Sequence, residues 1–133
     1  NIPSSISLLK NLKNLLIYNC KKLETIPDQI GDLNSMYFLS ISECESLGSI
    51  PDTIGNLSSL RSLVIDDNRT LTTLPDTIGR LENLELLTLT GTPLRDLPIE
   101  ELKSLPLLIH IGYDNKTLQN LTDEEKEFLE SVQ

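Results

Sequence analysis

LRSLVIDDNRTLTTLPDTIGRL, residues 60–81, is the stretch that decides the fold, because its apolar pattern recurs on both sides of it. Counted from Leu60, nearly all the same offsets are apolar in a copy that begins 24 residues earlier at Met36, and again in one that begins at Leu12. Each copy ends in isoleucine or leucine, then proline, aspartate, any residue, isoleucine, glycine, any residue and leucine. Three successive copies of one period predict a solenoid in which each coil packs on its neighbours.

The first half of each repeat predicts a short strand, because two apolar residues spaced by two point to the same side of a strand. Successive strands are reached by crossovers of one hand, so they should lie parallel in one sheet. For the last strand Leu108 and His110 offer an alternative register, and Asp114 or Asn115 should follow at the turn. The expected strand centres are Leu15 to Ile17, Leu39 to Ile41, Leu63 to Ile65, Leu87 to Leu89 and Ile109 to Ile111.

A residue that can bond the backbone is expected where each strand ends. Cys20, Cys44, Asn68 and Thr92 occupy equivalent positions, and we expect them to stack in one inward row that serves backbone groups left over by the sheet. The interstrand spacing of about 5 Å would permit a disulfide between the two cysteines, but we predict free buried thiols. In the second half of each repeat an aspartate should cap the turn that follows proline. These capping residues are Asp28, Asp52 and Asp76.

The repeats are expected to fill residues 1–121. Residues 1–11 match only the second half of a repeat, and full repeats should start near residues 12, 36, 60, 84 and 105. The fourth is expected to shorten to 21 residues, because Leu94 comes one residue early and the glycine is missing after Pro98. We expect the chain to be a fragment of a longer protein, with an N-terminal edge that self-associates through exposed apolar residues.

Residues 122–133 predict a C-terminal capping helix. Thr122 and Glu125 have the spacing of a capping box, in which each side chain bonds the backbone N–H of the other residue. Phe128, Leu129 and Val132 share one face of such a helix. That face should cover the last coil of the solenoid; an acidic docking helix is the alternative.

The repeat pattern LxxLxLxx(N/C)xxL, followed by (I/L)PDxIGxL, resembles the leucine-rich repeat family. The 24-residue length and the second half are similar to plant-type repeats, and Cys20 and Cys44 are similar to the cysteine-containing repeats of intracellular plant immune receptors. Similar repeats occur in bacterial effectors injected into plant cells. The resemblance implies an α/β solenoid: a right-handed arc with one parallel concave sheet and short irregular or 3₁₀ convex turns. It also implies a protein-interaction function.

Composition narrows the partners and the compartment. The net charge of −9 argues against nucleic acid and anionic membrane surfaces, and no apolar run reaches the roughly 20 residues that membrane insertion needs. Free cysteines indicate a cytoplasmic protein. Glycosylation sequons keep a secreted protein as the alternative, although the one at Asn68 should be buried. The sequons begin at Asn56, Asn68, Asn115 and Asn120.

The sequence holds none of the common enzyme or phosphate-binding motifs, so we expect no enzyme, no cofactor and no metal site. His110 is expected to have a surface or packing role. Glu43, Asp66 and Asp67 could be imagined as a carboxylate pair or a calcium site, but a solvated acidic edge is the better interpretation because nothing nearby would bury them.

Residues that alternate with the buried ones should project from the concave face and bind a protein partner. Apolar side chains gather among them beside an acidic edge, so the partner should offer an apolar centre with basic residues at one side. Scattered apolar surface residues are the alternative interpretation. Two other functions stay open: the substrate-targeting domain of an enzyme such as a ubiquitin ligase or kinase, and a secreted receptor ectodomain. The expected partner-binding residues are Leu16, Tyr18, Phe38, Ser40, Glu43, Val64, Asp66, Asp67, Leu86 and Thr88.

Overall fold

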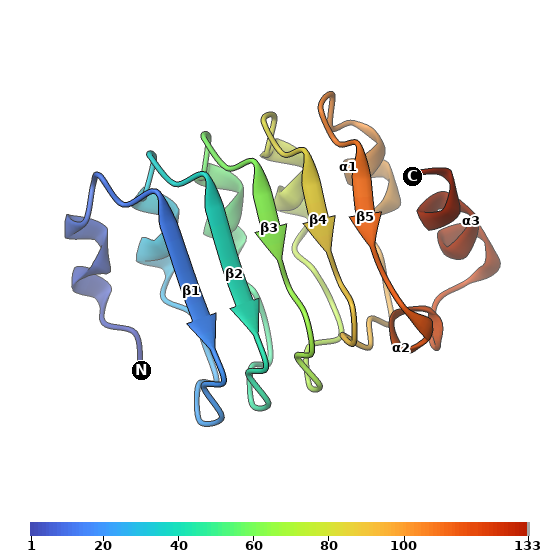
Figure 1. Cartoon of the computed structure of the whole chain (residues 1–133), viewed down its shortest axis with the longest axis horizontal. Coiled ribbons are helices and arrows are strands. Elements are labelled where there is room, and N and C mark those ends of the chain that lie inside the picture. Colours follow the sequence, from blue (N-terminus) through green and yellow to red (C-terminus); the bar gives the residue numbers. More distant parts are fainter. Residues whose placement is uncertain (133) are drawn as a thin grey trace.

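The structure, a computed structural model, describes residues 1–132; Gln133, the last residue of the expected terminal helix, lies outside the described residues. Within residues 1–132 the chain forms one sheet of five strands, arranged in sequence order, with the helical segments behind it (Figure 1). All neighbouring strands pair in parallel, as the repeat pattern predicted. The strands are β1 (Asn14–Tyr18), β2 (Phe38–Ser42), β3 (Ser62–Val64), β4 (Leu86–Thr88) and β5 (His110–Gly112).

The convex side is built from one short helical turn per coil. In the coils before β4 each turn is a 3₁₀ helix preceded by an extended proline. The prediction that Asp28, Asp52 and Asp76 cap these turns is wrong: proline is the N-cap residue, and no side chain makes a capping hydrogen bond. The proline carbonyl instead accepts the first hydrogen bond of each turn. The helices are η1 (Ser4–Leu8), η2 (Asp28–Asp32), η3 (Asp52–Asn56), η4 (Asp76–Arg80), α1 (Ile99–Lys103), α2 (Asn115–Leu118) and α3 (Asp123–Ser131).

The fifth repeat begins at Leu108 and not near residue 105, because β5 keeps the 24-residue spacing. Leu86 pairs with His110, and Leu87 pairs with Ile111. Of the inward pair predicted for this strand, Ile111 is fully buried but Ile109 is 70% exposed. The 21-residue fourth repeat predicted from the sequence is therefore wrong.

An α-helical turn restores the residue that the first half of the fourth repeat lacks. In η4 the N–H of Ile78 donates to the carbonyl of Pro75, three residues back (3.1 Å), whereas in α1 the N–H of Leu102 donates to the carbonyl of Pro98, four residues back (3.0 Å). An α turn closes over one more residue than a 3₁₀ turn. The fourth repeat therefore recovers its full length on the convex side.

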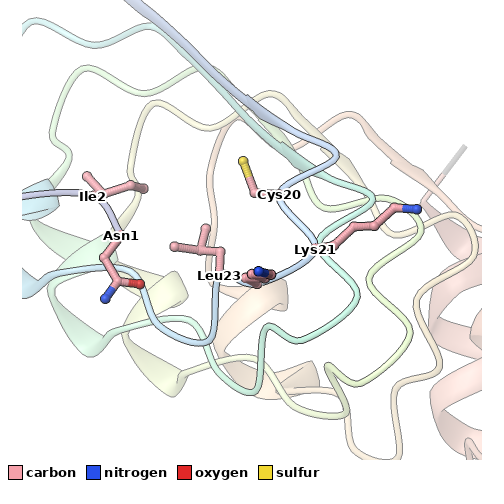
Figure 2. Close-up of a pocket in the computed structure, with 6 residues that line it drawn as sticks. Asn1, Ile2, Cys20, Lys21 and Leu23 are labelled. Carbon is pink, nitrogen blue, oxygen red and sulfur yellow. The ribbon is translucent and has the colours of Figure 1, made fainter.

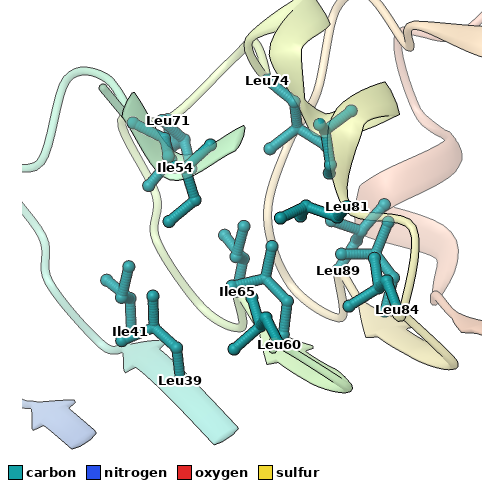
Figure 3. Close-up of a cluster of buried hydrophobic side chains, with 14 of the residues drawn as sticks. Leu39, Ile41, Ile54, Leu60, Ile65, Leu71, Leu74, Leu81, Leu84 and Leu89 are labelled. Atoms are coloured by element: carbon teal, nitrogen blue, oxygen red, sulfur yellow. The ribbon is translucent and has the colours of Figure 1, made fainter. Parts of the chain in front are cut away.

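The core runs along the whole solenoid between the sheet and the convex turns. Figure 3 shows how Leu39 and Ile41 from one coil stack beside Leu60 and Ile65 of the next. All four are at most 1% exposed. Each such residue contributes roughly 1.5–3 kcal/mol when it is fully buried, so stacked aliphatic residues support a domain with few aromatic ones.

At the C-terminal end α3 covers the last coil, and its predicted capping box is confirmed. The carboxylate of Glu125 accepts from the N–H of Thr122 (2.9 Å), and the Thr122 hydroxyl accepts from the N–H of Glu125 (3.2 Å). The other carboxylate oxygen of Glu125 accepts from the N–H of Leu97 (2.6 Å), which ties the helix to the preceding coil. Phe128 and Leu129 are buried in the core beneath the helix.

The N-terminal end is less covered, and we expect it to open first. Leu12 and Leu15 are only half-buried and Ile17 is 6% exposed, whereas the equivalent third-repeat residues Leu63 and Ile65 are 1% and 0% exposed. Hydrogen exchange should be faster at the amides of Leu15 and Ile17 than at those of Leu63 and Ile65, because β1 pairs with β2 alone among the described strands, whereas β3 lies between β2 and β4.

Sedimentation of the same sample shows whether it is monomeric. Equal protection of the two strands in a monomer would contradict this prediction. Protection of β1 that rises with concentration would instead indicate the predicted self-association through the N-terminal edge.

Candidate functional site

The face of the sheet turned away from the core, called here the concave face, carries the candidate binding residues in rows across the strands. Within a row, neighbours stand 24 residues apart, as in the pairing of Phe38 with Ser62 and of Ser62 with Leu86. All ten predicted site residues belong to this face or to its edge at the carboxyl ends of the strands. They are Leu16, Tyr18, Phe38, Ser40, Glu43, Val64, Asp66, Asp67, Leu86 and Thr88.

Four apolar residues cross the concave face in a zigzag, one from each of the strands β1 to β4. Phe38 and Leu86 lie in one row, whereas Leu16 and Val64 lie in the next row, two residues further along their strands. Leu16 is 66% exposed, and the other three are half-buried by their neighbours in the sheet. The sheet therefore presents an apolar centre, flanked by the hydroxyls of serine and threonine.

An acidic edge, formed by Glu43, Asp66 and Asp67, follows the carboxyl ends of the strands. The hydroxyl of Tyr18 donates to a carboxylate oxygen of Glu43 (3.1 Å), and this hydrogen bond raises the pKa of Tyr18. Glu43 and Asp67 have positive φ angles of 55° and 54°, and Gly91 holds the corresponding place with φ of 72°. A left-handed residue thus ends each of these strands at the same point and sets where the acids stand.

Asp66 is more enclosed than a solvated acid on an edge would be. One of its carboxylate oxygens accepts from the N–H of Thr90 (3.0 Å), so its side chain reaches across to the next coil. Burial raises the pKa of Asp66, and the nearby carboxylates of Asp67 and Asp114 raise it further. The expectation that nothing nearby would bury these acids is therefore wrong for Asp66, which is half-buried.

A ladder of side chains beneath this edge fixes the spacing of the coils. Asn68 accepts from the N–H of Cys44 (3.0 Å) and donates to the carbonyl of Ile41 (2.8 Å), so it bonds two backbone groups of the preceding coil. Thr92 repeats the arrangement one coil on, accepting from the N–H of Asn68 (3.3 Å) and donating to the carbonyl of Ile65 (2.8 Å). The predicted inward row is confirmed for Cys44, Asn68 and Thr92, all of which are fully buried.

Thr117 is a further member of the ladder that the sequence reasoning missed. It is fully buried, and its hydroxyl donates to the carbonyl of Leu89 (2.7 Å). Its position, 25 residues after Thr92, is the signal that could have revealed it. Asp114, expected at the turn, is the N-cap of α2 and accepts from the N–H of Gly91 (3.0 Å) and of Thr117 (3.1 Å). Burial raises the pKa of Asp114, but hydrogen bonds of this kind outweigh burial and lower it.

Cys20 departs from the predicted row, because β1 is the first strand in residues 1–132 and no earlier strand of that part covers Cys20. Both cysteines are free, as expected, but only Cys44 is buried, and burial raises the pKa of its thiol. Cys20 is exposed, and its sulfur donates to the carbonyl of Tyr18 (3.5 Å). Figure 2 shows Ile2, Cys20 and Leu23 around an opening at this end of the solenoid.

The concave face also contains residues that the sequence reasoning did not assign to it. His110 and Gly112 of β5 extend the rows of Leu86 and Thr88. Among residues 1–132, no group of three or more histidine, cysteine, aspartate or glutamate side chains could hold a metal ion. No helix in that part of the chain is long and apolar enough to cross a bilayer.

Solved structures of leucine-rich repeat proteins share this architecture. A leucine-rich repeat protein of Leptospira interrogans is 31% identical with a TM-score of 0.71, over 86% of this chain and 28% of that one. The plant peptide hormone receptor RGFR1, in complex with RGF2, is 28% identical with a TM-score of 0.70, over 85% of this chain and 18% of the receptor. The leucine-rich repeat domain of the type III effector XopL is 30% identical with a TM-score of 0.62, over 91% of this chain and 35% of that one.

The chain is therefore a leucine-rich repeat protein, and its repeats form a solenoid arc with one parallel sheet. It spans about a third or less of the length of these three structures. No protein-family model and no curated protein sequence matches it. The similar structures include a plant peptide hormone receptor and a type III effector.

Proposed function

We propose that this chain is a protein-interaction module that binds a protein partner on its concave face and performs no catalysis itself. The observation that carries the proposal is the apolar zigzag of Leu16, Phe38, Val64 and Leu86 on the side of the sheet opposite the core. Apolar side chains gathered on a surface and bordered by polar ones are typical of interaction sites. The structure of RGFR1 supports the proposal, because this plant peptide hormone receptor has a similar fold and is in complex with RGF2.

The acidic edge indicates the charge of the partner. Glu43, Asp66 and Asp67 border the apolar centre on one side, in a chain whose net charge is −9. Complementary charges across an interface mainly accelerate association and select partners. The partner should therefore present an apolar centre with basic residues on the side that meets this edge.

Replacing both Phe38 and Leu86 by serine should abolish binding with little loss of stability. Peptides selected on the unchanged protein from a displayed library of random 12-residue sequences serve as the probe, and their affinities are measured by calorimetry. Losing two apolar contacts should cost about 3 kcal/mol or more, which is at least roughly 100-fold in Kd. A thermal melt of the variant checks that it still folds.

The matched control replaces Leu8 and Leu107, which are 76% and 45% exposed and lie outside the concave face, by serine. This variant should bind the selected peptides like the parent. In a second arm, Asp66→Asn with Asp67→Asn should mainly slow association and weaken its salt dependence. The proposal fails if the Phe38 and Leu86 variant binds as tightly as the parent, or if substitutions near Asp28, Asp52 and Asp76 on the convex side remove binding instead.

We propose a cytoplasmic location on the basis of the two free cysteines. A secreted receptor ectodomain is the second candidate, because the sequon residues Asn56 and Asn120 are exposed and could accept glycans. Asn68 is fully buried and cannot be modified in the folded chain. Mass spectrometry of the protein from its native source decides between them: glycans at Asn56 and Asn120 would show secretion.

A further inference from the structure

A second row of side chains runs along the amino ends of the strands, on the side of the concave face opposite the acidic edge. Backbone hydrogen bonds hold the row together. The N–H of Tyr37 donates to the carbonyl of Lys13 (2.8 Å), that of Arg61 to Tyr37 (2.9 Å), that of Glu85 to Arg61 (2.8 Å) and that of Ile109 to Glu85 (2.9 Å). We call this set the amino-end row. Each member directly precedes a residue of the row that contains Phe38 and Leu86, as Tyr37 precedes Phe38.

Within the amino-end row, two cations enclose one aromatic ring. The ammonium of Lys13 lies 5.9 Å from the ring centroid of Tyr37, and the guanidinium of Arg61 lies 5.6 Å from it. Contacts of this kind hold a cation over a ring with about 0.5–1 kcal/mol at exposed sites. The two cations therefore have preferred positions in the free protein, which lowers the entropy cost of using them in binding.

Neither cation forms an ion pair with the acids around it. In the part of the chain that the structure describes, the ion pair present joins Lys103 and Glu100 on the convex side, and none involves Lys13 or Arg61. Glu85 is the next residue of the row after Arg61, yet the guanidinium lies over Tyr37 instead. An acidic protein thus keeps two unpaired, exposed cations beside its candidate binding surface.

We propose that Lys13, Tyr37 and Arg61 form a receptor for an aspartate or glutamate side chain of the protein partner that occupies the concave face. The proposal rests on the proposed function and adds a second point of contact to it. A guanidinium offers paired N–H donors that match a carboxylate, and the ammonium adds a second positive charge. The ring of Tyr37, which lies beside both cations and is 45% exposed, would contact the apolar part of that acidic side chain.

The amino-end row and the acidic edge together predict the sequence pattern of the bound segment. Arg61 and Asp66 are five residues apart on the same repeat, which is about 17 Å along an extended strand. An extended partner segment lying along the strands would place an acidic residue on the amino-end row and a basic residue about five positions away on the acidic edge. Apolar residues between them would contact Phe38, Val64 and Leu86 of the zigzag.

The test uses the library of random 12-residue peptides, selected on the unchanged protein and sequenced. Enriched peptides should pair an acidic and a basic residue about five positions apart with apolar residues between them. Synthetic copies with amidated C-termini confirm that a side chain and not the terminal carboxylate is bound. Lys13→Gln with Arg61→Gln should raise the Kd of these peptides by about tenfold or more, and Tyr37→Leu should raise it less.

A matched control, Lys22→Gln with Arg80→Gln, removes the same charge from exposed positions outside the concave face and should leave affinity within about twofold. For peptides whose acidic residue is changed to glutamine, the Lys13 and Arg61 substitutions should no longer change the affinity, because the peptide change and the protein change remove the same contact. Independent effects of the two changes would overturn the proposal.

The outcomes separate this inference from the proposed function. If the Phe38 and Leu86 variant loses binding but the Lys13 and Arg61 variant does not, the concave face is the site and the carboxylate receptor is wrong. If the selected peptides ignore Phe38 and Leu86, the proposed function itself fails. Thermal melts of all variants exclude loss of folding, which substitutions at exposed positions should not cause.

Discussion

Replacing Gly55 by alanine should destabilise the chain by about 2–4 kcal/mol, because the added methyl group has no room between two coils. A Cβ at this position would lie 2.5 Å from the carbonyl oxygen of Thr77 and 2.8 Å from its Cβ. Thr77 cannot move aside freely, because its hydroxyl donates to the carbonyl of Asp52 (2.7 Å) in the same turn as Gly55. The convex turns would have to separate, and urea denaturation measures the cost.

Gly48 provides the matched control in the same repeat. A Cβ there would meet no atom within 4 Å, so Gly48→Ala should be neutral or should stabilise by up to about 1 kcal/mol, through the lower entropy of the unfolded chain. Gly31 repeats the geometry of Gly55 against Thr53, again at 2.5 Å and 2.8 Å, and its alanine variant should also be destabilised. Equal stability of the Gly55 and Gly48 variants would show that the coils are not packed this closely.

The regular part of the fold could be predicted from the sequence because one period dictates both the strands and their register. Leu39 and Leu63 are 24 residues apart, and they are paired in the sheet. Departures from the period were harder to predict. The deletion before Leu94 is visible in the sequence, but its compensation depends on an α turn replacing a 3₁₀ turn after Pro98, and spacing alone does not distinguish them. The register of β5 was therefore wrong.

Position within a repeat predicts where a side chain lies, but its neighbours decide what it does. Cys20 and Cys44 hold equivalent positions, yet Cys20 is exposed because, among the residues that the structure describes, β1 is the first strand and covers it on one side only. The concave rows followed from alternation along the strands. The amino-end row was missed because it stands just outside the alternating segment, although its spacing of 24 residues is readable. The sequence does not predict whether Arg61 lies over Tyr37 or pairs with Glu85. The three-dimensional structure shows that it lies over Tyr37 and makes no ion pair with Glu85.

Asn68→Leu should lower the free energy of unfolding by about 2–5 kcal/mol, because it leaves two buried backbone groups without partners. The similar size of leucine and asparagine does not offset this loss. The amide of Asn68 serves both the N–H of Cys44 (3.0 Å) and the carbonyl of Ile41 (2.8 Å), and leucine can serve neither. Each buried group that loses its partner costs about 1–3 kcal/mol. Water cannot replace the amide without opening the ladder, since Asn68 is 0% exposed.

Two further variants test whether the cost arises from the ladder. Asn68→Cys places at this position the residue that the preceding coil has at Cys44, whose thiol lies 4.0 Å from the carbonyl of Ile17, the equivalent of Ile41 one coil earlier. A thiol is a weak donor that can partly serve the carbonyl of Ile41 but is a poor acceptor for the N–H of Cys44, so this variant should fall between the parent and Asn68→Leu. Asn56→Leu makes the same change at an exposed position and should stay within about 0.5 kcal/mol of the parent. If Asn68→Leu unfolds at the same urea concentration as Asn56→Leu, the amide does not hold the coils together, and the stacking of the apolar core alone would have to set their spacing.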